Sequence, residues 1–214
     1  MVKINDPGIL APTANLSSAA FDNRFNPQVK EPWSFHVNEF QSKTSAYSLP
    51  CMKAVLLAEH ECGLDIREVS PNNSKRIAMY KNGRKNSDAW CASFVSWLYG
   101  KGQGSSNSST FGYCPSTQTI RMNAIDAGCY AKKNTGYTPR VGDLAMWKRG
   151  GWQGHIGIVS KVYPDGSFDV IEGNSNNDKV EKIHYKSQNH VSKTFDGFVK
   201  MNEWTSGHKV TLKA

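Results

Sequence analysis

The sequence predicts an α+β fold, because helical patterns occupy its first half and alternating patterns occupy its second half. Apolar residues recur at helical spacing through the first half, whereas from Gly136 onward they alternate with polar residues. A chain of 214 residues can bury one domain well but is too short for two domains of ordinary size. We therefore expect N-terminal helices packed on an antiparallel β-sheet.

The start of the chain differs in composition from the remainder. Residues 1–47 are rich in Pro, Asn and Ser and carry isolated aromatic side chains. This composition predicts an extended arm that packs its aromatic residues onto a neighbouring domain. We place the boundary after this arm and expect the folded domain to span residues 48–214.

Helix start and stop signals predict four helices ahead of the sheet. Ser48 can cap the first helix, Pro50 suits its first turn and Gly63 ends it. The third helix is expected to begin after Ser87 or Asp88, since either side chain is a good N-cap. A Gly/Ser-rich loop is expected between the last two helices, over residues 100–110. The predicted helices span residues 48–62, 75–80, the segment between Asp88 and Gly100, and residues 116–127.

Alternating patterns predict at least four strands after the helices. The Pro164–Asp165–Gly166 segment is a turn signal between the second and third strands. A two-residue turn at Pro164 and Asp165 would pair Tyr163 with Gly166. The predicted strands span residues 143–147, 155–162, 167–172 and 195–201.

The formal net charge of +8 indicates either an anionic partner or simply a soluble surface. Nucleic acid is not expected, because the 26 Lys and Arg residues form no basic helix face and no zinc-finger or RNA-binding motif occurs. Bacterial cell walls are also anionic, so a wall polymer is an equally good partner by charge. The charge alone does not distinguish these readings.

No apolar run approaches the roughly 20 residues that cross a bilayer, so stable membrane insertion is not expected. The N-terminal stretch MVKINDPGILAPTANLSS contains no apolar core of a secretory signal peptide. We therefore expect that any work outside the cytoplasm depends on another route of export.

Five cysteines leave one unpaired even if the others form disulfides, which marks a reactive thiol as a candidate. No CxxC spacing occurs, so we expect no structural zinc site. Cys51 and Cys62 would lie on one helix about 16 Å apart, too far to bridge. A disulfide between Cys114 and Cys129 is left open, although five free thiols are slightly favoured.

Cys91 is the cysteine whose predicted position favours reactivity. It is expected to lie about three positions into a capped helix, where free N–H groups and the positive end of the helix dipole stabilise a thiolate. A cysteine on an apolar helix stripe is more often an inert core residue. A catalytic role therefore requires a partner base.

His155 is the candidate base, at the start of a predicted strand with glycines on both sides. The two-residue turn would pair His155 with Asn174 and place Glu172 opposite Gly157, on the same sheet face as the imidazole. A carboxylate and an amide beside the ring could hold its tautomer and stabilise the imidazolium. A bulged turn would instead move Glu172 to the other face.

Competing motifs are weaker. His60 is not followed by a second histidine at HExxH spacing, and no P-loop, dinucleotide glycine pattern or GxSxG elbow occurs. Asp143, at a strand entry, is expected to stabilise a turn. We therefore expect no cofactor and no metal ion. The other histidines are expected at the surface: His36, His184, His190 and His208.

Several segments of the chain resemble the CHAP family, the cysteine- and histidine-dependent amidohydrolases and peptidases. They are AWCASFVSWL around Cys91, TPRVGDLAMW leading into the sheet, GHIGIV around His155, and IEGNSN, which begins at Ile171. An upstream segment, REVSPNNSKRIAMY, resembles the E-x-x-x-x-NN stretch that often precedes the cysteine helix of the family. Together they cover about residues 48–175 in the family's order.

The resemblance implies a papain-like fold, in which the helix with Cys91 packs against the sheet that carries His155. It implies peptidoglycan as the substrate, cut at the N-acetylmuramoyl–L-alanine amide or within the peptide stem or bridge. Cys91 would be the nucleophile and His155 the general base and acid. Glu172 would be the third catalytic residue, with Asn174 as a further polar contributor.

Two tryptophans flank these residues and are expected to bind substrate. Trp90 directly precedes the candidate nucleophile, and Trp152 lies just before the candidate base. The cleaved bond is not defined, because specificity depends on loops that carry no readable pattern.

Other functions use the same residues. A cysteine protease or deamidase acting on proteins would share the chemistry, and a catalytically silent wall-binding module would keep only the fold. For a wall hydrolase, we expect an antibacterial effector that acts in the periplasm or cell wall of a target bacterium, with a cognate immunity protein as a second partner. A phage endolysin is the alternative.

Overall fold

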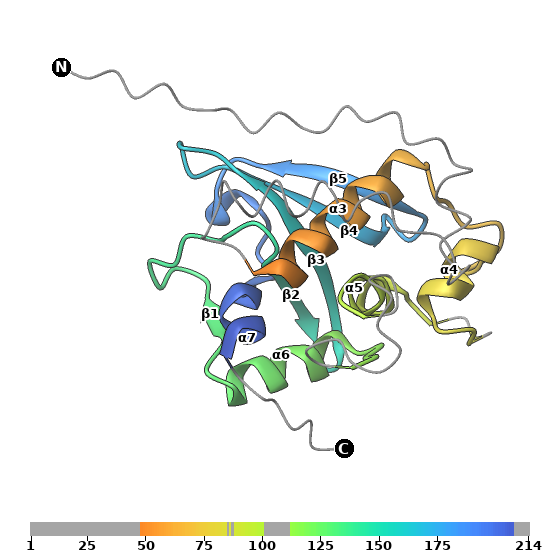
Figure 1. Ribbon diagram of the computed structural model, residues 1–214, viewed down its shortest axis with the longest axis horizontal. Coiled ribbons are helices and arrows are strands. Elements are labelled where there is room, and N and C mark those ends of the chain that lie inside the picture. Colours follow the sequence, from red (N-terminus) through yellow and green to blue (C-terminus); the bar gives the residue numbers. More distant parts are fainter. Residues whose placement is uncertain (1–47, 85, 87, 101–111, 208–214) are drawn as a thin grey trace.

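Figure 1 shows the computed structural model, which describes residues 48–84, 86, 88–100 and 112–207. The predicted N-terminal arm and nearly all of the predicted Gly/Ser-rich loop lie outside these residues. The described helices are α3 (Leu49–Gly63), α4 (Lys75–Tyr80), α5 (Cys91–Leu98), α6 (Thr117–Asp126) and α7 (Met201–Gly207), with a short 3-10 helix at Gln188–His190.

A six-stranded antiparallel sheet follows the first four of these helices, so the predicted α+β class is confirmed. The strand order is β1-β6-β2-β3-β4-β5, so that β2, β3 and β4 form consecutive hairpins at the centre. The strands are β1 (Tyr130–Lys132), β2 (Leu144–Gly150), β3 (Gln153–Val162), β4 (Phe168–Ser175), β5 (Lys179–Tyr185) and β6 (Phe195–Val199).

The predicted caps hold for α3 but not for α5. The Ser48 hydroxyl accepts a hydrogen bond from the Cys51 amide at 3.4 Å, as expected for an N-cap. Helix α5 instead has Trp90 at its N-cap and no side-chain cap, so Asp88 does not cap it. The Asp88 carboxylate accepts from the Asn86 side chain at 2.5 Å, and Ser87 lies outside the described residues. Cys91 is therefore the first residue of the helix, not the third.

Strands β1 and β5 and helix α7 were not predicted from the sequence. Strand β5 alternates only half-buried and exposed residues with one fully buried position, because it is an edge strand rich in Lys and Glu. Strand β1 has only three residues, too few to show alternation. The last predicted strand is too long, since β6 ends at Val199 and Met201 begins α7.

The β3–β4 hairpin reaches the predicted register by a different route. Its turn has three residues, with the Tyr163 amide bonded to the Ser167 carbonyl at 2.9 Å, so the two-residue turn was wrong. A bulge between Val159 and Lys161 adds one residue to β3 and cancels the shift. Glu172 therefore lies opposite Gly157, as the simpler turn had predicted.

The sheet carries an apolar layer on each face. Alternate residues of β2 divide between the layers, with Leu144 and Met146 packed against the helices and Ala145 and Trp147 on the other face. Helix α5 is buried along its whole length in the first layer. Within the described part of the chain, no helix is long and apolar enough to span a membrane.

Candidate active site

Cys91 lies at the N-terminus of α5, where the backbone N–H groups have no partner within the helix. Its side chain is buried, with 4% of its surface exposed. The preceding residue, Trp90, is completely buried and stacks against Tyr80, with 5.8 Å between the ring centroids. These contacts place the thiol at a fixed point beside the sheet.

Trp90 also makes a hydrogen bond that ties the start of α5 to an upstream loop. Its indole N–H donates to Glu68 Oε1 at 2.9 Å, and Glu68 Oε2 accepts from the Asn72 amide at 2.6 Å. Glu68 and Asn72 are the acid and an asparagine of the E-x-x-x-x-NN stretch. Trp90 is thus a core residue that offers no surface to a substrate, contrary to the sequence expectation.

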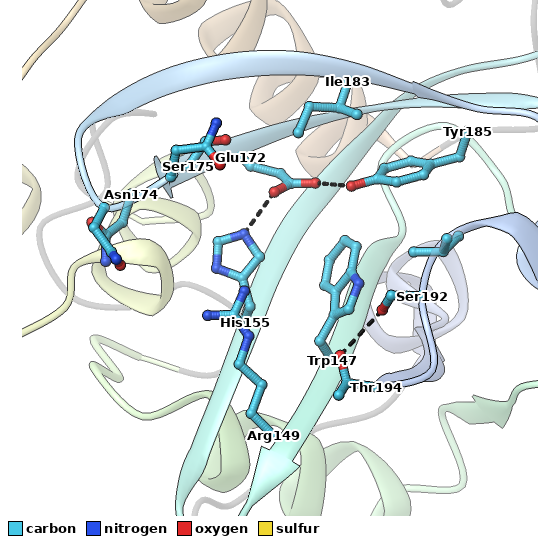
Figure 2. Close-up of a pocket in the computed structure, with 13 residues that line it drawn as sticks. Trp147, Arg149, His155, Glu172, Asn174, Ser175, Ile183, Tyr185, Ser192 and Thr194 are labelled. Atoms are coloured by element: carbon cyan, nitrogen blue, oxygen red, sulfur yellow. Dashed lines mark hydrogen bonds and ion pairs between the residues drawn. The ribbon is translucent and has the colours of Figure 1, made fainter.

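His155 lies at the start of β3, opposite Trp147 in the sheet register. Its Nε2 lies 2.7 Å from Glu172 Oε2 on the neighbouring strand (Figure 2). The second carboxylate oxygen, Oε1, accepts a hydrogen bond from the Tyr185 hydroxyl, also at 2.7 Å. Both oxygens of Glu172 are therefore engaged, and Nδ1 is the imidazole nitrogen left for the thiol.

The electrostatics of the imidazole connect it to Cys91. Burial by itself would lower the pKa of His155, but hydrogen bonding and charge interactions with the Cys91 and Glu172 side chains raise the pKa to about 9. The protonated ring is therefore favoured at neutral pH when its two partners carry negative charge. An imidazolium between a thiol and a carboxylate is the arrangement that activates a cysteine nucleophile.

A match with a known family agrees with this geometry. A family model described as CHAP domain matches residues 80–174. This segment belongs to the CHAP family. It contains Cys91, His155 and Glu172, whereas residues 48–79, which we expected to share the resemblance, lie outside the match. No curated protein and no solved structure gave a significant match to the chain.

CHAP domains form a family of cysteine amidases and peptidases, which is the enzyme class that the Cys–His–Glu arrangement supports. All five cysteines are free, so Cys114 and Cys129 are not bridged. Burial raises the pKa of the Cys51 thiol to about 11 and also raises the pKa values of Cys62, Cys114 and Cys129.

Two glycines allow the helix and strands of the CHAP domain to approach one another closely. A Cβ atom on Gly157 would lie 2.8 Å from Glu172 Cγ and 2.5 Å from a Val170 methyl group. A Cβ atom on Gly173 would lie 2.7 Å from Phe94 on α5. Hydrogen atoms at these positions let Glu172 reach the imidazole and let α5 pack onto β4 directly beside it.

Asn174 and Trp152 occupy different surroundings. Asn174 has a left-handed backbone conformation (φ 58°), and its buried Oδ1 has no hydrogen-bond partner among the described residues. It lines the same pocket as His155. Trp152 is 72% exposed in the turn between β2 and β3 and does not line that pocket.

The pocket beside His155 has a volume of about 390 Å³ and a mostly polar lining. It is bordered by Trp147 and Tyr185 from the sheet and by residues of the loop before β6, but not by Cys91. Trp147 packs against the imidazole with ring centroids 5.3 Å apart. The pocket therefore opens on the imidazole side of the Cys91–His155 pair. The lining comprises Trp147, Arg149, His155, Glu172, Asn174, Ser175, Asn176, Asn177, Ile183, Tyr185, Val191, Ser192 and Thr194.

The remaining candidate polar residues have structural positions. Asp143 is fully buried and accepts hydrogen bonds from the Tyr137 hydroxyl at 2.6 Å and the Arg140 amide at 2.8 Å, as expected for a turn-stabilising residue. His184 is half-exposed and paired with Asp169 at 2.7 Å. Among the described residues, no group of His, Cys, Asp and Glu is arranged to hold a metal ion.

Proposed function

We propose that the chain is a peptidoglycan hydrolase that cleaves an amide bond through a cysteine thioester, with a papain-like arrangement of its catalytic groups. The observation that carries the proposal is the position and charge of the His155 imidazole. Its Nε2 lies 2.7 Å from Glu172 Oε2, and interactions with Cys91 and Glu172 raise its pKa to about 9. The family's character as cysteine amidases and peptidases supports the reaction type.

In this mechanism the Cys91 thiolate attacks the carbonyl carbon of the substrate amide. The oxyanion that forms would be stabilised by the Cys91 backbone N–H, at the positive end of α5, together with a second donor. His155 then gives its proton to the amide nitrogen, the C–N bond breaks and the amine departs. Glu172 stabilises the imidazolium before this step and orients the ring throughout.

The resulting thioester links the substrate's acyl group to Cys91. His155, now neutral, removes a proton from a water molecule that attacks the thioester carbonyl. Collapse of the second tetrahedral intermediate releases a carboxylic acid, and the thiolate–imidazolium pair is restored. Asn174 is proposed as a polar contributor, because its unpartnered Oδ1 lines the pocket and can accept a hydrogen bond from the substrate.

Peptidoglycan is the proposed substrate because the CHAP family is associated with wall hydrolysis and because the charge of +8 suits an anionic wall. The bond would be the N-acetylmuramoyl–L-alanine amide or an amide of the peptide stem or bridge. Trp152, exposed at the β2–β3 turn, is retained as a proposed contact for the extended polymer.

We further propose that the enzyme is an antibacterial effector that acts in the periplasm or cell wall of a target cell. A cognate immunity protein would then be expected to cover the Cys91 site. The compact catalytic unit supports this role, and a phage endolysin would use the same chemistry. Production in the bacterial periplasm, with and without a co-expressed neighbouring gene product, tests for toxicity and protection.

The decisive experiment is digestion of purified peptidoglycan followed by mass spectrometry of the released fragments. We expect the parent protein to release fragments with one new amine and one new carboxylate, and Cys91→Ala to release none while keeping its fold by circular dichroism. Cys62→Ala is the matched control, because Cys62 is half-buried on α3 and does not line the pocket beside the imidazole.

Three outcomes would overturn the proposal in different ways. Equal digestion by Cys91→Ala would exclude the thioester mechanism. Binding to peptidoglycan without release would favour a silent wall-binding module. Cleavage of denatured proteins with intact peptidoglycan would favour the protease alternative.

A further inference from the structure

Arg149 contributes a positive charge to the pocket beside the imidazole. It follows Trp147 by two residues on β2, and Trp147 lies opposite His155 in the register. Figure 2 shows the Arg149 side chain running alongside the pocket toward His155 rather than away from it. None of the ion pairs within the described residues includes Arg149.

The pocket offers this guanidinium no carboxylate of its own. The one acidic side chain in the lining is Glu172, and its two oxygens are engaged by His155 and Tyr185. The rest of the lining is uncharged apart from the imidazole. An unpaired arginine in a polar pocket suits a carboxylate ligand, because the planar guanidinium can donate two parallel hydrogen bonds to its oxygens.

The position of the pocket indicates which part of a substrate it would receive. The acyl group of the substrate becomes bonded to Cys91, whereas the leaving amine takes its proton from His155. His155 lines the pocket and Cys91 does not. A pocket on the imidazole side alone therefore accepts the amine-side fragment.

We propose that Arg149 is a specificity residue that binds a free carboxylate on the amine-side fragment of the substrate. The proposal rests on the proposed amide hydrolysis and narrows its substrate class. The departing amine belongs to an amino acid or peptide that carries a carboxylate close to the scissile nitrogen. Stem peptides whose carboxyl groups are amidated, and simple uncharged amines, are poor leaving fragments for this pocket.

The test uses two sets of purified muropeptides that differ only in whether the side carboxyl groups of the stem are free or amidated. We expect the parent enzyme to prefer the free carboxylate by about tenfold to a hundredfold in kcat/KM, the range of a charge-assisted hydrogen bond. Arg149→Gln should lose this preference by slowing cleavage of the free-carboxylate set alone, and Arg149→Lys should retain part of it.

Lys148→Gln is the matched control. Lys148 is the exposed neighbour of Arg149 on the same strand, and it does not line the pocket. Its substitution removes the same charge from the protein and should leave the preference intact. Equal slowing of both muropeptide sets by Arg149→Gln, or no preference in the parent enzyme, would overturn the assignment.

A second measurement separates this proposal from the proposed function. If the parent enzyme cleaves neither set, the amide hydrolysis fails, and binding still tests the pocket. Calorimetry with Cys91→Ala would then compare a free stem peptide with its carboxamide form. At least tenfold tighter binding of the carboxylate, lost in Cys91→Ala/Arg149→Gln, supports the site, and equal affinities reject it.

Discussion

The two halves of the candidate catalytic site are positioned by different kinds of interaction. On the sheet, His155 and Glu172 lie on neighbouring strands, and the backbone hydrogen bonds between β3 and β4 set their separation. On the helical side, Cys91 follows an irregular stretch of chain whose course depends on individual side chains. The position of the imidazole should therefore tolerate substitutions around it better than the position of the thiol.

Two side chains hold the irregular stretch before Cys91. Glu68 accepts the indole hydrogen of Trp90, the residue directly before the proposed nucleophile Cys91. Lys81, with 2% of its surface exposed, donates to the backbone carbonyls of Asn72 at 3.0 Å and of Asn86. Burial lowers the pKa of Lys81, although the carboxylates of Asp88 and Glu68 oppose that effect. Few other side chains could replace Lys81 here, because a buried charge must be compensated by hydrogen bonds such as those to these carbonyls.

The largest expected effect comes from removing the carboxylate on the sheet. Glu172→Ala takes away the partner of the imidazole, and we expect kcat to fall by about a hundredfold to a thousandfold with little change in fold. Steady-state kinetics on muropeptides would measure this loss. Glu181→Ala, on the neighbouring strand and paired with Lys179, should change kcat by less than about twofold.

The next effect concerns the stability of the helical side. Glu61 is fully buried and accepts hydrogen bonds from Arg76 at 2.5 and 2.8 Å and from the Tyr80 hydroxyl at 2.5 Å. Glu61→Gln leaves the guanidinium without its charge partner, and we expect a loss of about 3 kcal/mol in the free energy of unfolding. Urea denaturation followed by fluorescence would measure it.

A surface ion pair provides the control for this loss. Lys200, which directly precedes α7, is paired at 2.5 Å with the partly exposed Glu203 in its first turn. Glu203→Gln should cost less than about 1 kcal/mol. Equal losses in the two variants would mean that the Glu61 contacts do not hold α3 and α4 together as their burial indicates.

A smaller effect is expected at the contact before the nucleophile. Glu68→Ala removes the acceptor of the Trp90 N–H, and we expect about a tenfold loss in kcat with KM nearly unchanged, the order of one lost charge-assisted hydrogen bond. Glu68→Gln keeps an acceptor oxygen and should restore most of the rate. The rate of Cys91 alkylation should also fall in Glu68→Ala and recover in Glu68→Gln. The melting temperatures of the two variants should differ much less.

The smallest expected effect is a shift of the pH profile. With the pKa of His155 raised to about 9, kcat/KM should fall on the alkaline side near pH 9, where the imidazolium loses its proton. Glu172→Gln removes one of the causes that raise this pKa, so its alkaline limb should lie at lower pH. A limb that stays in place would show that Cys91 alone sets the charge of the ring.

The same shift predicts how pH affects stability. The folded protein holds the His155 proton more tightly than the unfolded chain, whose histidines titrate near pH 6.5. The stabilisation from the charged imidazole is therefore complete below about pH 6.5 and is lost as the pH rises through about 9. Melting temperatures across this range should fall in the parent protein and fall less in Glu172→Gln.

The sequence was most informative where backbone periodicity decides the structure. Alternation located β2, β3 and β4 to within a few residues. The predicted pairing of Glu172 with Gly157 also holds, but it was derived from a two-residue turn and results instead from a three-residue turn and a bulge. The α+β class follows from the same change of period. Where side chains decide, prediction was weaker: the start of α5 was placed too early because Asp88 looked like a cap, and Trp90 looked like a substrate contact.

Some residues of the candidate site lie outside the predicted strands and were missed. Tyr185 holds the second oxygen of Glu172 from β5, an edge strand with little apolar alternation. Arg149 enters the pocket from the exposed end of β2. Glu68 was noticed as part of a motif, but its bond to Trp90 spans 22 residues and no local pattern indicates it.

The bulge at Ser160 decides which face of the sheet carries Glu172. It adds one residue to β3 and offsets the extra residue in the Tyr163–Ser167 turn. If the ladder continued from the three-residue turn without a bulge, Glu172 would lie opposite Ile158, which faces the helices, and would be separated from the imidazole. The bulge therefore offsets the longer turn, and together they leave the pairing that a two-residue turn with a regular ladder would give.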